Sequence, residues 1–151
     1  MREHNLWTIF DRVSREVPDR ECLSWRHETT TFAMLADRSR RLANVLLDGG
    51  LAPRSGGDDE LPWECGQDTV GLLLLNGTEY LEATLGAYAA RTVPFNINYR
   101  YVAKELAYLL SDAKPKALIF HGRFADSLAD ALKMVDDPPA QLGDGGVVRP
   151  Q

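Results

Sequence analysis

The feature that most constrains the fold is an unbroken apolar run at residues 70–75, which reads VGLLLL. The run shows no alternation of apolar and polar residues, so both faces of the strand that it predicts are expected to be covered. Two further apolar segments, 93–97 and 117–120, follow at intervals that leave room for a helix between successive strands. Buried strands separated by helices are typical of a parallel sheet.

The intervals between these strands have helical periodicity. Apolar residues recur there at steps of three and four, as they do on the buried face of a helix. They are Leu81, Leu85 and Tyr88; Val102, Leu106, Leu109 and Leu110; and Phe124, Leu128, Leu132 and Val135. Asn76 is expected to cap the first of these helices, with Glu79 reaching back to it. The predicted fold class is therefore α/β, a doubly wound and mostly parallel sheet flanked by helices.

The first fifty residues predict smaller elements. A helix is expected from Leu6 to Val17, capped by Asn5 and ended by Pro18. Two short strands, 21–25 and 29–31, predict a small N-terminal hairpin. A second helix is expected to follow and to end at Gly49 and Gly50, because glycine readily adopts the backbone conformation that closes helices.

Two segments lack periodic apolar residues. Residues 52–67 are polar, acidic and rich in glycine and proline, and they predict a surface loop in which Trp63 would be an anchor. After Val135 the chain again becomes rich in Asp, Pro and Gly. We expect residues 136–151 to form a disordered tail and residues 1–135 to form the folded domain.

Composition narrows the functional classes. The chain has 17 lysines and arginines against 22 aspartates and glutamates, a net charge of −5, which disfavours a nucleic-acid partner. Cys22 and Cys65 have no zinc-site or disulfide spacing. The N-terminus lacks the apolar stretch of a signal peptide, and no apolar run is long enough for a transmembrane segment. These features predict a cytoplasmic protein.

Catalytic motifs are missing from the sequence. It contains no GxxxxGK[ST] phosphate loop, no GxGxxG after a strand and no GxSxG elbow. The three histidines, His4, His27 and His121, are scattered and predict surface positions. No catalytic residue and no metal ligand is therefore assigned.

The candidate binding residues are Tyr99, Arg100 and Tyr101, which follow the strand at 93–97. Ligands of open α/β sheets bind at the carboxyl ends of the strands. An arginine between two tyrosines can pair with a phosphate while the rings contact a base or an acyl chain. The alternative is that Arg100 pairs with a nearby acid and the tyrosines only pack on the domain surface.

Three segments in the same order, 68–82, 93–101 and 105–113, resemble the AMP-forming acyl-CoA synthetases of the adenylate-forming superfamily. The segment 62–68 is similar to the corresponding loop of bacterial fatty-acid and sterol-side-chain acyl-CoA synthetases. The resemblance runs from about Leu6 to Val135. It implies that residues 1–135 are a partial AMP-binding domain, the opening part of the family's large N-terminal domain, and that residues 136–151 are a non-family tail.

The resemblance also implies a reaction, in which a carboxylate, ATP and CoA give acyl-CoA, AMP and pyrophosphate. The intact family enzyme uses ATP, Mg²⁺ and CoA. In some relatives the loop at the position of Tyr99, Arg100 and Tyr101 approaches the nucleotide end of CoA, so Arg100 is expected to contact its phosphates. The family's phosphate loop, magnesium glutamate and catalytic lysine have no counterpart in this sequence, so no cofactor is expected to be bound by the fragment alone.

Two main interpretations follow. The chain is expected to be a ligase portion truncated before the phosphate loop and inactive by itself. The alternative is a non-catalytic interaction module that pairs with a separately encoded ligase remainder or with itself. A nucleotide-binding switch of flavodoxin-like shape would need a phosphate-binding loop, which the sequence lacks.

Overall fold

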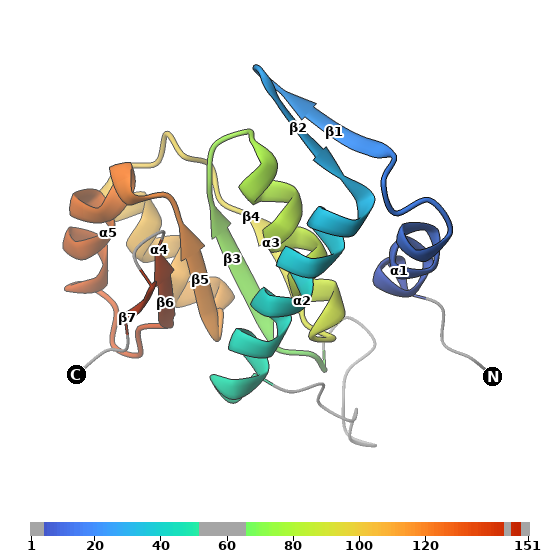
Figure 1. Cartoon of the computed structure of the whole chain (residues 1–151). Coiled ribbons are helices and arrows are strands. Elements are labelled where there is room, and N and C mark those ends of the chain that lie inside the picture. Colours follow the sequence, from blue (N-terminus) through green and yellow to red (C-terminus); the bar gives the residue numbers. More distant parts are fainter. Residues whose placement is uncertain (1–4, 52–65, 144–145, 149–151) are drawn as a thin grey trace.

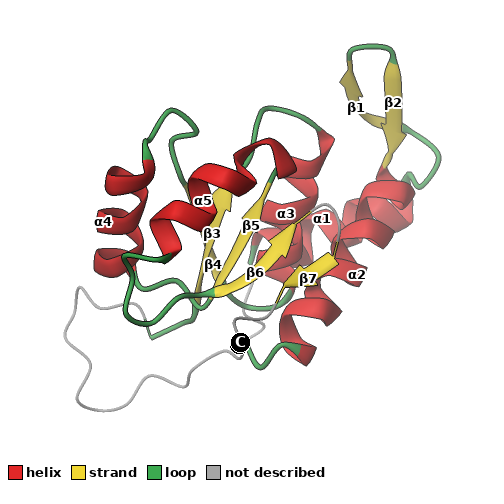
Figure 2. Ribbon diagram, turned by 90° about the vertical axis from the view of Figure 1, so that its left-hand side faces the viewer, coloured by secondary structure: helices red, strands yellow, loops and turns green. Residues whose placement is uncertain are grey.

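A computed structural model describes residues 5–51, 66–143 and 146–148. The main part of the chain has three layers, with a sheet between two groups of helices (Figure 1). Turned by 90°, the sheet lies between α4 and α5 on one side and α1, α2 and α3 on the other (Figure 2). The predicted α/β class with helices on both faces of a sheet is confirmed.

The sheet has five strands in the order β4-β3-β5-β6-β7. The first four in this order run parallel, and β7 pairs antiparallel with β6. Their bounds are β3 Thr69–Leu73, β4 Val93–Asn96, β5 Ala117–Phe120, β6 Ala140–Gly143 and β7 Gly146–Val148. The three apolar segments of the sequence thus form the three adjacent strands β4, β3 and β5.

Each face of β3 packs against its own group of helices. Val70, Leu72 and Leu74 share a buried cluster with α2 (Phe32–Asp48) and α3 (Thr78–Ala89). Leu73 belongs to a second buried cluster, together with α4 (Ala103–Ala113) and α5 (Ala125–Leu132). The unbroken apolar run is explained, because both faces of the strand are removed from water.

The N-terminal elements form as expected. Helix α1 (Leu6–Glu16) is capped by Asn5, whose Oδ1 accepts the Thr8 N–H at 2.8 Å. Strands β1 (Glu21–Trp25) and β2 (Glu28–Thr31) form an antiparallel hairpin that is separate from the main sheet (Figure 1). The Phe10 and Phe32 rings, 5.8 Å apart between centroids, join α1 to the start of α2.

Helices α2 and α3 approach closely at Gly86. A Cβ atom at this position would lie 2.8 Å from Leu42 Cδ2 and 3.1 Å from Leu42 Cβ, so a larger residue would require Leu42 to shift. An ion pair between Arg38 and Glu82, 2.8 Å from nitrogen to oxygen, crosses the same interface and raises the pKa of Arg38. The contact between these helices therefore includes a close approach of the Leu42 side chain to the Gly86 backbone and an ion pair.

Strand β4 is an edge of the sheet. Val93 and Ile97 donate their N–H groups to Asp68 and Leu72 of the neighbouring chain segment, both at 2.9 Å. In a strand the N–H groups alternate in direction, so Pro94 lies where the N–H would point to the open edge. The proline therefore costs no ladder hydrogen bond.

Two expectations are wrong. Residues 136–151 are not uniformly without structure, because β6 pairs with β5 and β7 pairs with β6. A strand of ordinary composition can form there because β5 offers a free edge of backbone donors and acceptors. Asn76 is not the cap of α3; Gly77 occupies that position, without a side-chain hydrogen bond. The predicted loop with Trp63 lies mostly outside the described residues.

The buried hydroxyl of Ser39 provides a test of the helical core. Ser39 is 0% exposed, and its Oγ has no hydrogen-bond partner among the described residues, whereas the buried Ser14 Oγ donates to the Asp11 carbonyl at 2.8 Å. We expect Ser39→Ala to be more favourable than Ser14→Ala by about 1 kcal/mol in the free energy of unfolding. Denaturant unfolding of the two variants measures this difference, and equal effects would contradict it.

Candidate functional site

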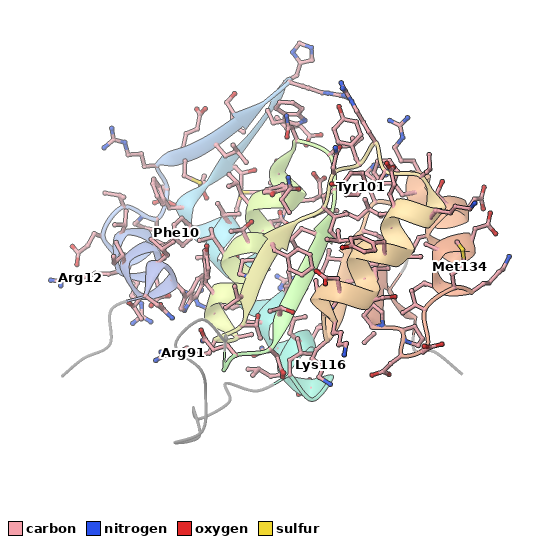
Figure 3. All side chains as sticks on the ribbon, turned by 180° about the vertical axis from the view of Figure 1, so that it is seen from behind. Phe10, Arg12, Arg91, Tyr101, Lys116 and Met134 are labelled. Carbon is pink, nitrogen blue, oxygen red and sulfur yellow. The ribbon has the colours of Figure 1, made fainter. Side chains whose placement is uncertain are left out.

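The carboxyl ends of β4, β3 and β5 meet at one edge of the sheet, because the three strands are parallel neighbours. From this edge β3 leads into α3 on one face, while β5 leads into α5 on the other. Adjacent strands whose connections leave to opposite faces form the crevice in which open α/β sheets bind ligands. Figure 3 shows Tyr101 at this end of the molecule, with Arg91 and Lys116 at the opposite end.

The turn from β4 to α4 presents the predicted residues. Its backbone is held by Asn98, whose Oδ1 accepts the Arg100 N–H and whose carbonyl accepts the Tyr101 N–H, both at 3.1 Å. Tyr99, Arg100 and Tyr101 are all exposed on this fixed turn. The turn thus directs three side chains outward and leaves Ile97 buried behind them.

The turn from β5 to α5 lies beside it and contains a short 3-10 helix, Gly122–Phe124. The His121 N–H donates to the Leu73 carbonyl at 3.1 Å and so ties this turn to the end of β3. His121 Nδ1 accepts the Arg123 N–H at 3.2 Å, which leaves Nε2 as the protonated nitrogen of the neutral ring. The position of Phe124 is thereby fixed.

The two turns meet through aromatic rings. Tyr99 stacks on Phe124 with 6.3 Å between ring centroids. The Arg100 guanidinium lies 5.7 Å from the centroid of Tyr99, and the Arg123 guanidinium lies 5.5 Å from the centroid of Phe124. We call Tyr99, Arg100, Arg123 and Phe124 the arginine–aromatic cluster. It joins segments that follow two different strands.

The guanidinium groups of this cluster have no carboxylate partner among the residues that the structure describes. Several other arginines do: Arg15 and Arg40 pair with Asp11, and Arg38 pairs with Glu82. Glu105 in the first turn of α4 accepts the Val102 N–H with its Oε2 at 2.9 Å and forms no ion pair with either arginine in this part of the chain. The alternative in which Arg100 pairs with a nearby acid is thus not seen, although Tyr99 does pack on the surface.

Tyr101 takes a different direction from its two neighbours. With Lys104, Glu105, Tyr108 and Leu109 it lines a shallow hollow of about 340 Å³ on α4. The structure therefore brings Tyr99 and Arg100 together with the β5 turn and places Tyr101 in the adjoining hollow. Arg123 and Phe124 were not assigned to the site from sequence, although their place directly after a buried strand was a usable signal.

The third turn at this edge, between β3 and α3, does not suit a phosphate group. A Cβ atom placed on Gly77 would lie 2.6 Å from Glu79 Oε2, so the carboxylate lies against the start of α3. An anion is stabilised at a helix N-terminus by the free N–H groups and the helix dipole, and Glu79 already supplies that negative charge. A second anion would be repelled.

The metal-ligating and nucleophilic side chains of the described residues form no second site. No three of their His, Cys, Asp and Glu side chains come together as a group able to hold a metal ion. Burial raises the pKa of the Cys22 thiol, whose Sγ lies 3.3 Å from the Thr30 carbonyl oxygen, and this disfavours the reactive thiolate. None of the helices in this part of the chain is both long and apolar enough to cross a bilayer.

A family model described as AMP-binding enzyme matches residues 10–147. The match extends past Val135, so it includes β6, most of β7 and part of the segment predicted as a non-family tail.

Two curated relatives are similar over most of this chain. The medium-chain acyl-CoA ligase Mig of Mycobacterium avium is 39% identical over an alignment of 145 positions that covers 89% of this chain and 26% of that protein. The 3-oxocholest-4-en-26-oate--CoA ligase of Rhodococcus rhodochrous is 33% identical over 128 residues, 85% of this chain and 21% of that protein. The chain thus spans about a quarter of the length of the relatives it matches.

Solved structures share the fold. The benzoate CoA ligase of Burkholderia xenovorans superposes with a TM-score of 0.78 at 20% identity, covering 94% of this chain and 26% of that one. The N-terminal domain of FACL13 from Mycobacterium tuberculosis gives a TM-score of 0.76 at 24% identity, covering 95% of this chain and 34% of that one.

The contact between the two turns can be measured by a double-mutant cycle. We expect Tyr99→Ala and Phe124→Ala to be coupled by about 0.5–1.5 kcal/mol in the free energy of unfolding, as is usual for aromatic pairs. Tyr108, which is 74% exposed on α4, serves as the control ring, and its cycle with Phe124 should give no coupling. A coupling of zero between Tyr99 and Phe124 would contradict the cluster.

Proposed function

The chain belongs to the AMP-binding enzyme family, and we propose from this that it forms the N-terminal portion of an AMP-forming acid–CoA ligase. The reaction of the whole ligase joins a carboxylate to CoA and converts ATP to AMP and pyrophosphate. Because the relatives are named for medium-chain acyl and sterol-side-chain acids, we propose a fatty or sterol-derived acid as substrate. We place the protein in the cytoplasm, where ATP and CoA are available.

The observation that carries this proposal is the 39% identity to an acyl-CoA ligase over 89% of the chain. Solved CoA ligases below 25% identity support the fold alone, and the strand-edge geometry supports a ligand site at the β4 and β5 turns. Family membership and the site geometry are independent observations, and both favour a ligand-binding part of a larger enzyme.

The proposed role of this portion is to bind CoA. Arg100 and Tyr99 would contact its phosphates and nucleotide, since an unpaired guanidinium forms strong, charge-assisted hydrogen bonds to phosphate. Tyr101 lines the adjoining hollow and is proposed to contact the same ligand. Arg100 and Arg123 are exposed and form no ion pair with a carboxylate among the described residues. This changes the expectation for the isolated chain, for which we now propose weak CoA binding.

Adenylation is proposed to depend on other parts of the ligase. When bound, ATP and Mg²⁺ supply the activated phosphate and the charge that stabilises its transfer. The β3 turn of this chain, with Glu79 against the start of α3, is unsuited to hold ATP phosphates. This portion therefore contributes a CoA-facing surface and the opening strands of the domain.

A second candidate function is that of an interaction module. Leu6 and Ile9 of α1 line a hollow of about 350 Å³ that reaches Val93 at the start of the edge strand β4. After this strand, Val102 at the N-terminal cap of α4 and Tyr108 on α4 are 61% and 74% exposed. Apolar surface near an open strand edge favours contact with another polypeptide, either a separately encoded remainder of the ligase or a second copy of this chain.

The proposal that adenylation depends on other parts of the ligase is tested by carboxylate-dependent exchange between ATP and pyrophosphate. We expect none from the purified 151-residue chain. We expect exchange when this chain replaces the matching segment of the Mycobacterium avium ligase, whose remainder alone is the control. Robust exchange by the lone chain, or a folded hybrid without exchange, would contradict the proposal.

The exposed apolar surface is tested by sedimentation. We expect the isolated chain to self-associate, because removal of apolar side chains from water stabilises a contact by about 25 cal/mol per Å². Replacing Val102 and Tyr108 with Ser should reduce the association, while Ser substitutions at the exposed Ala125 and Met134 provide a control. A chain that stays monomeric at high concentration would argue against the interaction module.

A further inference from the structure

We propose that the outer face of α4 is the contact surface for a second copy of this chain, and that the two copies pack these helices antiparallel about a two-fold axis at Tyr108. The inference rests on the second candidate function, the interaction module, and it commits that function to one partner. It does not depend on the proposed binding of CoA.

Helix α4 has one covered side and one open side. Leu106 and Leu110 are buried in the cluster that α4 shares with the sheet and α5. Lys104, Tyr108 and Asp112 are exposed, and Tyr108 is 74% exposed. Figure 2 shows α4 in the outer layer of helices, on the side of the sheet away from α1, α2 and α3. A surface that covers the Tyr108 ring would therefore remove a large apolar area from water.

The three exposed residues form one row along the helix, because side chains four positions apart lie on the same side of it. The row has a base at Lys104, an aromatic ring at Tyr108 and an acid at Asp112. The commonest packing of two helices in globular proteins aligns rows of this kind. When the second helix runs antiparallel with Tyr108 opposite Tyr108, each Lys104 meets Asp112 of the second copy. The row is thus complementary in charge to itself.

The hollow beside this row provides the groove that such packing requires. The next row on α4 consists of Tyr101, Glu105 and Leu109, and together with Lys104 and Tyr108 these residues line the hollow of about 340 Å³. Helices pack with the ridge of one in the groove of the other, so the Tyr108 ring of each copy would enter the hollow of the second copy. A two-fold contact uses the same ring and the same hollow twice.

The charged ends of the row are available for a contact between copies. Neither Lys104 nor Asp112 forms an ion pair within the part of the chain that the structure describes. Glu105, the other acid beside the hollow, accepts the Val102 N–H with its Oε2, which draws this carboxylate toward the start of α4. Asp112 is therefore the acid that the row offers to Lys104 of a second copy.

The same charges select the orientation and the partner. Parallel helices would place Lys104 against Lys104 and Asp112 against Asp112, and like charges in contact disfavour that arrangement. A different polypeptide would need a base and an acid at the same separation on either side of an apolar group. A second copy carries both by symmetry, so it is the occupant that the row favours.

The test reverses the charges in the 151-residue chain, with association measured by sedimentation at low salt. The variants are Lys104→Glu and Asp112→Lys, each alone and both mixed in equal amounts. Each variant alone brings like charges together at both ends of the contact. In the mixture, opposite charges face each other at both ends. Both changes also suit α4 itself, because an acid near the start of a helix and a base near its end are stabilising.

The matched controls are Lys116→Glu and Asp137→Lys. Both residues are exposed, and Figure 3 shows Lys116 at the opposite end of the molecule from Tyr101. These substitutions change the net charge by the same amounts as the two test variants, so they separate the local contact from the effect of overall charge.

We expect the parent chain to form dimers and each test variant alone to associate roughly 10-fold more weakly, because two attractive pairs become two repulsive ones. The mixture should recover the affinity of the parent. Each control should stay within about 3-fold of the parent, as expected for charges outside the contact. At 1 M salt, where the screening length falls to about 3 Å, the difference between the parent and the test variants should shrink.

The remaining outcomes would overturn the inference. Dimers that form equally well in all variants, or variants that mixing does not restore, would show that copies meet through another surface or in another orientation; the interaction module would stand. A monomeric parent chain that binds the separately produced remainder of the ligase would keep the module and reject a second copy as its partner. A chain that binds neither would overturn both.

Discussion

The structure depends on the burial of β3 on both faces. Val70 and Leu72 pack toward α2 and α3, and Leu73 packs toward α4 and α5. The fit is close at Gly71, where a Cβ atom would lie 2.9 Å from both Ile97 and Leu118. Because β3 lies between β4 and β5 and pairs in parallel with both, all three strands end at the same edge. The position of the candidate site follows from this one constraint.

The arrangement separates two kinds of surface. At the carboxyl edge the arginine–aromatic cluster offers two guanidinium groups that, among the described residues, have no carboxylate partner. Along the β4 side, α1 and α4 present apolar side chains near an open strand. Positive charge without a carboxylate partner favours binding of a small anionic ligand. Apolar surface at a strand edge favours contact with another polypeptide. Both fit a chain that spans about a quarter of the length of its ligase relatives.

Local sequence patterns predicted the elements that are stabilised by contacts between residues close in sequence or by burial of an entirely apolar segment. Each of these elements can be recognised from its own sequence, by helical periodicity, strand-and-turn pattern or an apolar run. They are the helices α1 and α4, the hairpin and the three apolar strands. Strand β6 has no apolar run, and it exists because β5 offers it a pairing edge. The candidate site likewise has one part that local sequence predicts and one part that depends on the tertiary fold. Tyr99 and Arg100 could be identified from their place after a strand, but the contact with Phe124 requires the strand order, which no local pattern contains.

The central claim is that the β4 and β5 turns meet beside β3 in the folded chain. Nuclear Overhauser contacts between the ring protons of Tyr99 and Phe124 in the 151-residue protein test it most directly. The 6.3 Å between the stacked ring centroids predicts clear cross-peaks between the two rings. Assigned ring signals without any such cross-peak would show that the turns lie apart, and the site built on them would then have no basis.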